Sequence, residues 1–143
     1  MATLGGVREP GETEAFFARN LADWAQHGFG WWTVCDRASG RFAGRGGLRR
    51  VEVAGGREVE VGYGFLPEYW GHGLATELVA ASVAVAFETL QLEDLVCFTL
   101  RSNRASRRVM EKVGFRFERE GLHANLPHVF CRLTAAEWGS RRH

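Results

Sequence analysis

The stretch Pro67-Glu68-Tyr69-Trp70-Gly71-His72-Gly73-Leu74-Ala75-Thr76-Glu77 places two glycines, one residue apart, between a strand-like segment and an apolar, helix-like segment. Glycine lets the chain turn sharply and lets an anion approach the backbone, because it has no Cβ. The amide groups that open a helix have no intrahelical partners, and the helix dipole adds partial positive charge to them. This stretch therefore predicts a site for a phosphate-bearing ligand.

Size and composition favour one globular domain over residues 1–143. The chain is 45% hydrophobic and shows no internal repeat or low-complexity tract, so it has enough material for one core. Its 18 basic and 17 acidic residues give a formal net charge of +1, whereas nucleic-acid-binding proteins usually carry a clear basic excess. We therefore expect no nucleic-acid partner.

The sequence predicts neither a membrane segment nor a metal site. The N-terminus shows no signal-peptide pattern, and the longest apolar stretch, residues 78–87, is too short to span a bilayer. The three cysteines are odd in number and lack metal-ligand spacing, so we expect buried, reduced thiols. These features predict a cytoplasmic protein.

Hydrophobic periodicity and turn residues predict an α+β fold with a mostly antiparallel sheet. Antiparallel strands come first, a strand–helix–strand unit follows, and two more strands close the sheet. The expected helices are 12–26, 74–90 and 105–113, with a last turn that starts at a capping box over 134–137. The expected strands are 31–35, 41–51, 58–66, 95–100, 115–118 and 129–133, with a turn at 54–57.

Two segments resemble the GCN5-related N-acetyltransferase (GNAT) superfamily. Residues 70–75, Trp-Gly-His-Gly-Leu-Ala, resemble its acetyl-CoA-binding turn, in which Gln or Arg, two residues, Gly, one residue, and Gly or Ala follow one another. Residues 103–115 begin with Asn and end in Gly-Phe, and are similar to the family's second cofactor element. Two such elements in the right order are a stronger signal than a glycine pair alone.

One branch of the superfamily is the most similar. Trp-Gly at 70–71, Val-Gly-Tyr at 61–63 and the terminal residues 133–138 look like the branch that acetylates the N-termini of ribosomal proteins. The resemblance covers Glu12 to Trp138 and implies the GNAT fold, in which two central strands splay apart and helices flank the sheet. It also implies that the family's first strand and part of its first helix are missing here.

The resemblance implies that acetyl-CoA is the cosubstrate. Amides of residues 71–76 would hold its diphosphate, and its pantetheine arm would extend the edge of the strand over 60–66. Arg104, Arg107 and Arg108 would reach phosphate, with a solvated helix face as the alternative. The expected cofactor-binding residues are Phe65, Leu66, Trp70, Gly71, His72, Gly73, Leu74, Ala75, Thr76, Asn103, Ser106 and Arg107.

Acetylation of an amine needs a base for the amine and an acid for the departing thiolate. Many family members carry a tyrosine in the Asn-led helix as the acid, and the matching position here holds Met110. Ser106, one turn earlier, is the expected substitute, with a helix-surface serine as the alternative. Glu60 is the expected base, directly or through a water, with a solvated carboxylate as the alternative. His123 and His128 are expected in the loop before the last strand, near the acceptor.

These features together predict an acetyl-CoA-dependent N-acetyltransferase that acts on a primary amine by direct attack in a ternary complex. A protein N-terminus is the first candidate for the acceptor, and a small-molecule amine is the second. The alternative is a non-catalytic acyl-CoA-binding module, because Met110 replaces the usual acid and the opening of the chain is short. A Rossmann-type nucleotide binder is disfavoured, because the turn lacks its three-glycine spacing. We expect no membrane partner. The sequence leaves open whether the protein forms a homodimer.

Overall fold

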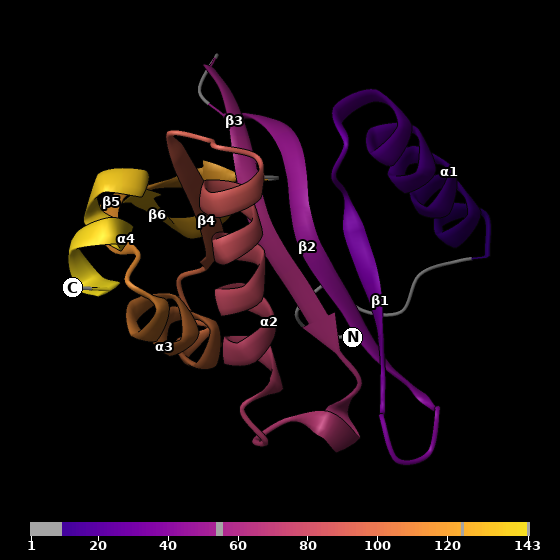
Figure 1. Ribbon diagram of the computed structural model, residues 1–143. Coiled ribbons are helices and arrows are strands. Elements are labelled where there is room, and N and C mark those ends of the chain that lie inside the picture. The colour runs from indigo at the N-terminus through magenta and orange to yellow at the C-terminus, as the bar shows by residue number, and fades with distance from the viewer. Residues whose placement is uncertain (1–9, 54–55, 124, 143) are drawn as a thin grey trace.

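The computed structural model describes residues 10–53, 56–123 and 125–142, and Figure 1 shows how their helices and strands are arranged. The helices are α1 (Pro10–His27), α2 (Leu74–Ala84), α3 (Arg104–Val113) and α4 (Ala135–Arg142), with a 3₁₀ helix η2 (Pro67–Tyr69) and a π-helical segment η3 (Val85–Thr89). The strands are β1 (Trp31–Cys35), β2 (Phe42–Val53), β3 (Gly56–Phe65), β4 (Asp94–Leu100), β5 (Arg116–His123) and β6 (Leu126–Thr134).

The six strands form one sheet in the order β1-β2-β3-β4-β6-β5. Neighbouring strands pair antiparallel, except that β3 and β4 are parallel. Within the described chain, β3 and β4 share a single bridge, between Glu60 and Val96. The two strands therefore meet at one point and part beyond it. This arrangement confirms the predicted α+β fold with splayed central strands.

Apolar residues of α2 and the central strands form the main core. Val79 and Val83 lie one turn apart on α2 and are fully buried, as are Leu48 of β2 and Leu95 of β4. Figure 1 shows α2 lying along β3, and α2 also packs against β2, with α1 at the β1 end of the sheet and α4 toward β5 and β6. The core comprises Phe29, Leu48, Val59, Val61, Val79, Val83, Ala86, Phe87, Leu95, Cys97, Met110, Phe115 and Leu133.

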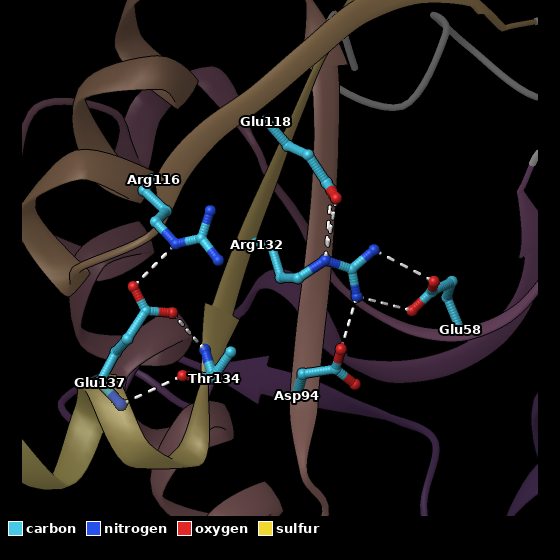
Figure 2. Close-up of polar contacts among 7 residues, drawn as sticks. All are labelled: Glu58, Asp94, Arg116, Glu118, Arg132, Thr134 and Glu137. Carbon is cyan, nitrogen blue, oxygen red and sulfur yellow. Dashed lines mark hydrogen bonds and ion pairs between the residues drawn. The ribbon is translucent and has the colours of Figure 1, made fainter.

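Local sequence signals set the ends of α3 and α4. Gly114 ends α3 in a left-handed conformation with φ of 117°, as its position predicts, and its amide donates to the Met110 carbonyl at 3.1 Å. The predicted capping box opens α4. The Thr134 amide donates to Glu137 and the Glu137 amide donates to the Thr134 hydroxyl, both at 3.1 Å (Figure 2). Arg116 adds a 2.8 Å contact to the Glu137 carboxylate.

Three expectations from the sequence need correction. The helix expected over 74–90 is α-helical only to Ala84 and continues as η3, where the Leu90 amide donates to the Val85 carbonyl at 3.0 Å. Strands β5 and β6 are longer than expected, so His123 lies in β5 and His128 lies in β6, and neither lies in a loop. Nearly every residue of β5 is exposed, so the strand has little alternation to detect. Cys35, at the end of the edge strand β1, is exposed, whereas Cys97 is buried.

Two further expectations concern the turn at 54–57 and a membrane segment, and both can be compared only with the described residues. Residues 54–55 of the turn expected at 54–57 lie outside them. Within them, no helix has the length and apolar character that a membrane crossing requires.

Two side chains of helix α1, Asn20 and Trp24, bind the backbone of Trp31 at the start of the edge strand β1. Asn20 Nδ2 donates to the Trp31 carbonyl at 2.9 Å, and Asn20 Oδ1 accepts from the Trp31 amide at 2.7 Å. Trp24 Nε1 donates to the same carbonyl at 3.2 Å. Helix α1 therefore provides hydrogen bonds that a neighbouring strand would otherwise give to these backbone groups.

Arg132 of β6 connects four strands on the closed side of the β3–β4 bridge (Figure 2). Its guanidinium donates two hydrogen bonds to Glu58 of β3, each at 3.1 Å, and also contacts Asp94 of β4. Its Nε donates to Glu118 of β5 at 3.2 Å. Because the side chain of Arg132 is only 20% exposed, water screens these contacts less than it screens fully exposed ion pairs. Side chains thus hold β3 and β4 together where backbone pairing is minimal.

We predict that Arg132→Met lowers the free energy of unfolding by about 2 kcal/mol, because hydrogen bonds to charged groups are lost and three carboxylates are left close together. Urea unfolding followed by circular dichroism measures the change. Arg41→Met is the matched control. Arg41 pairs with Glu68 at 3.5 Å, and these side chains are 64% and 52% exposed, so loss of the pair should cost less than about 0.5 kcal/mol. Equal effects of both substitutions would contradict the role of Arg132.

Candidate active site

Two glycines between β3 and α2 adopt left-handed conformations. Gly71 has φ of 80° and Gly73 has φ of 76°, where other residues are disfavoured by about 1–2 kcal/mol. A Cβ built on either glycine would meet no heavy atom within 4 Å beyond its chain neighbours. The space beside the turn is therefore open, and glycine is required by the backbone conformation and not by crowding.

The first turn of α2 presents its amide groups beside these glycines. Gly73 is the N-cap residue, and no side chain caps the helix there. The first intrahelical bond runs from the Glu77 amide to the Gly73 carbonyl at 3.1 Å. The amides of residues 74–76 precede it, so they are the unpaired donors of the helix start. Together with the positive end of the dipole they can bind an anion.

A cavity of about 610 Å³ is lined by this turn, by the parted section of β3 and β4, and by α3. The splayed strands therefore form one wall, while the glycine turn and α3 form the others. Nine of the twelve expected cofactor-binding residues lie in its lining. These are Phe65, Trp70, Gly71, Gly73, Leu74, Ala75, Thr76, Asn103 and Ser106.

Three expected residues lie outside the lining of the cavity, namely Leu66, His72 and Arg107. Arg107 Nη1 instead donates to the Arg101 carbonyl at 3.3 Å. The next residue, Arg108, lines the cavity together with Lys112, one turn later on α3. Of the three arginines expected to reach phosphate, Arg108 therefore lines the cavity, whereas Arg104 and Arg107 do not, and Lys112 is a cation that was not expected there.

Sequence reasoning missed Tyr63 as a residue of this cavity. Tyr63 lies two residues before Phe65 on β3, so both side chains point to the same face of the sheet. The two-residue spacing from Phe65, an expected cofactor-binding residue, was the sequence signal that could have identified Tyr63. The position of α3, which brings a partner to the Tyr63 hydroxyl, is not visible in the local sequence.

Trp70 lies in the turn and binds the end of β3. Its Nε1 donates to the Phe65 carbonyl at 2.8 Å. One backbone acceptor at the end of this strand is therefore already in use. A peptide-like ligand that pairs with β3 must use other backbone groups of the parted section.

Ser106 is buried in the wall of the cavity and held by two contacts. Its amide donates to Asn103 Oδ1 at 3.1 Å, which makes Asn103 the N-cap of α3. Its hydroxyl lies 2.9 Å from the Tyr63 hydroxyl. Met110, one turn after Ser106, is 4% exposed and belongs to the core. Of these two α3 positions, only Ser106 presents a hydroxyl to the cavity.

Glu60 lies at the point where the strands part, on the opposite face of the sheet from Tyr63. It is 5% exposed, and its Oε1 accepts a 3.0 Å hydrogen bond from Arg49. Burial raises the pKa of Glu60 above its usual value, and the Arg49 guanidinium opposes that effect. Glu60 is therefore not a solvated carboxylate, which was the alternative to its prediction as the base.

An aromatic cluster lies at the far ends of β4, β5 and β6. The ring centroids of Phe98 and His123 are 4.4 Å apart, and those of His123 and His128 are 5.2 Å apart. Burial, the neighbouring His128 and Arg49 lower the pKa of His123 below its usual value. Because Arg49 also binds Glu60, this cluster and Glu60 share one charged neighbour.

A family model described as an acetyltransferase (GNAT) domain matches residues 1–116. The chain belongs to the GNAT acetyltransferase family. Members of this family are acetyltransferases that use acetyl-CoA as the acyl donor, so the chain is a GNAT acetyltransferase.

The chain is similar to individual proteins and solved structures, two of which carry an acetyltransferase name. "Uncharacterized protein YkkB" of Bacillus subtilis is 26% identical over 119 residues, which are 83% of this chain and 69% of that protein. "Putative ribosomal N-acetyltransferase YdaF" of the same organism is 34% identical over 88 residues, 57% of this chain and 48% of that protein. The crystal structure of an acetyltransferase from Agrobacterium tumefaciens is 26% identical, with a TM-score of 0.79 over 92% of this chain and 76% of that one.

We predict that Gly73→Glu in this GNAT protein weakens acetyl-CoA binding at least about 100-fold, because a carboxylate would stand where helix amides meet the diphosphate. Isothermal titration calorimetry measures the affinity. Gly40→Glu is the matched control. Gly40 has a similar φ of 74° and equally open surroundings, but lies in the β1–β2 turn. Unchanged affinity in Gly73→Glu would contradict a role of the turn in cofactor binding.

Proposed function

We propose that this GNAT protein transfers the acetyl group of acetyl-CoA to a primary amine by direct attack in a ternary complex. One observation carries the proposal. A single cavity joins the open amides of α2, the parted strands and the Ser106 hydroxyl. A diphosphate, an extended arm and a leaving thiolate need these three features in that order.

Charge and shape along the cavity suit acetyl-CoA. The amides of residues 74–76 would bind its diphosphate, while Arg108 and Lys112 would neutralise further phosphate charge. Its peptide-like pantetheine arm would lie along β3, which beyond Glu60 pairs with β2 and no longer with β4 in the described residues. This path brings the thioester to the gap between the strands.

The acid and the base would act from opposite faces of the sheet. Ser106 lines the cofactor cavity and would donate a proton to the departing sulfur. Glu60 lies on the other face at the same gap and would accept a proton from the attacking amine, directly or through a water. Its raised pKa makes it a stronger base than an exposed carboxylate.

The acceptor we propose first is the free N-terminus of a protein, and a small-molecule amine is the second candidate. The name of YdaF describes a ribosomal N-acetyltransferase, which favours the first. Thiol release from acetyl-CoA should be followed with unblocked peptides, the same peptides with acetylated N-termini, and small amines. Amine-dependent release, with the added acetyl mass on the acceptor, is the expected result. Acetyl-CoA binding without release for any amine would favour the non-catalytic module.

We predict that Ser106→Ala lowers kcat about 100-fold, because a proton donor to the leaving group is removed. Its affinity for acetyl-CoA, measured by calorimetry, should change less than threefold. The matched control is Ser82→Ala. Ser82 is also buried, but its hydroxyl donates to the Leu78 carbonyl within α2, and it lies outside the cavity lining. If both variants turn over at the parent rate, Ser106 is not the acid.

We predict that Glu60→Gln removes an acid limb from the pH profile of kcat/KM. The base must be ionised, so activity is lost as pH falls through the pKa of Glu60, which lies above the usual carboxyl value. Amines of different pKa separate this limb from ionisation of the acceptor, because only the latter moves with the amine. Glu52→Gln, which changes an exposed β2 carboxylate, should keep the parent profile. An unchanged limb in Glu60→Gln would exclude Glu60 as the base.

A further inference from the structure

Tyr63 and Ser106 bring two hydroxyl groups into contact across the parted section of the sheet. Tyr63 comes from β3 beyond the Glu60 bridge, and Ser106 comes from the first turn of α3. Their oxygens are 2.9 Å apart, and both residues line the cavity. Because Asn103 fixes the amide of Ser106, the position of this hydroxyl pair is set from both sides.

A serine hydroxyl alone is a poor proton source for a thiolate. An alcohol, like water, is far less acidic than a thiol, whose pKa is about 8.5. Transfer from serine alone would leave an alkoxide far more basic than the thiolate that it neutralised. A phenol, with a pKa of about 10, is much closer to the thiol. Of the two hydroxyls, the one that can finally lose its proton is therefore that of Tyr63.

Building on the acetyl transfer proposed above, we propose that Tyr63 is a positioning residue that delivers a proton to the leaving sulfur through Ser106. As the amine bonds to the carbonyl carbon, the C–S bond breaks and its electron pair moves to sulfur. The Ser106 proton passes to sulfur while the Tyr63 proton passes to the Ser106 oxygen, so no alkoxide forms. The amine loses its proton to the base and then to solvent, and solvent reprotonates Tyr63. The sum is amine plus thioester giving amide plus thiol.

The surroundings of Tyr63 suit this role. Burial raises its pKa, with the Ser106 hydrogen bond opposing the effect, so the phenol stays protonated at neutral pH. A hydrogen bond donated by Tyr63 also orients the Ser106 hydroxyl, whose own proton then points to another acceptor. Met110, one turn after Ser106 on α3, carries no hydroxyl and is buried in the core. The β3 tyrosine thus supplies the phenol that α3 lacks at that position.

The test is Tyr63→Phe, which removes the hydroxyl and keeps the ring that packs near Phe65, at 6.3 Å between centroids. We expect kcat to fall at least about tenfold, with the KM for acetyl-CoA and the thermal midpoint nearly unchanged. A double-mutant cycle with Ser106→Ala provides the internal control. If the hydroxyls act in series, Tyr63→Phe should have almost no effect once Ser106 is alanine.

A fluorinated tyrosine at position 63 tests the role through the pH dependence of kcat, which a purely structural role of Tyr63 would not change. Its phenol is more acidic, so the alkaline limb of kcat should shift to lower pH, because the donor must be protonated. A parent-like kcat in Tyr63→Phe, additive losses in the cycle, or an unmoved limb would each overturn this role while leaving the proposed function intact. A parent that releases no thiol with any amine would overturn the proposed function, and the role of Tyr63 with it.

Discussion

A single backbone bridge, from Glu60 to Val96, joins the two central strands, and the rest of the site depends on it. On one side of the bridge, Arg132 draws Glu58 and Asp94 together, so the strands stay close. On the other side the strands part, and the cavity opens between β3, β4 and α3. Charged side chains thus close one end of the gap, so that the other end can stay open without unravelling the sheet.

The sheet also separates the two groups proposed to act as base and proton donor. Successive β3 side chains alternate between faces, so Tyr63 joins the cavity while Glu60 lies on the opposite face. In the proposed reaction, the base and the proton donor would therefore approach the thioester from different sides of the sheet. Their separation would limit direct neutralisation of one by the other.

Features that depend on nearby residues could be predicted from the sequence, and features that depend on distant packing could not. The glycine turn and the capping residues of α3 and α4 are local, and the structure places them as expected. Which of the expected arginines of α3 lines the cavity depends on the rotation of the helix, since one residue corresponds to about 100°, and only Arg108 does so. The contact between Tyr63 and Ser106 joins elements 43 residues apart. The four-strand cluster around Arg132 likewise exists only once the sheet has assembled.

The Asn20 amide has a consequence for how molecules of this protein meet one another. Free backbone groups at the rim of a sheet can recruit a strand from another molecule and nucleate cross-β stacking. Here one carboxamide satisfies both the N–H and the C=O of Trp31. Detachment of α1 would uncover both groups in one step, so the protection of this backbone position from another strand is linked to the docking of α1.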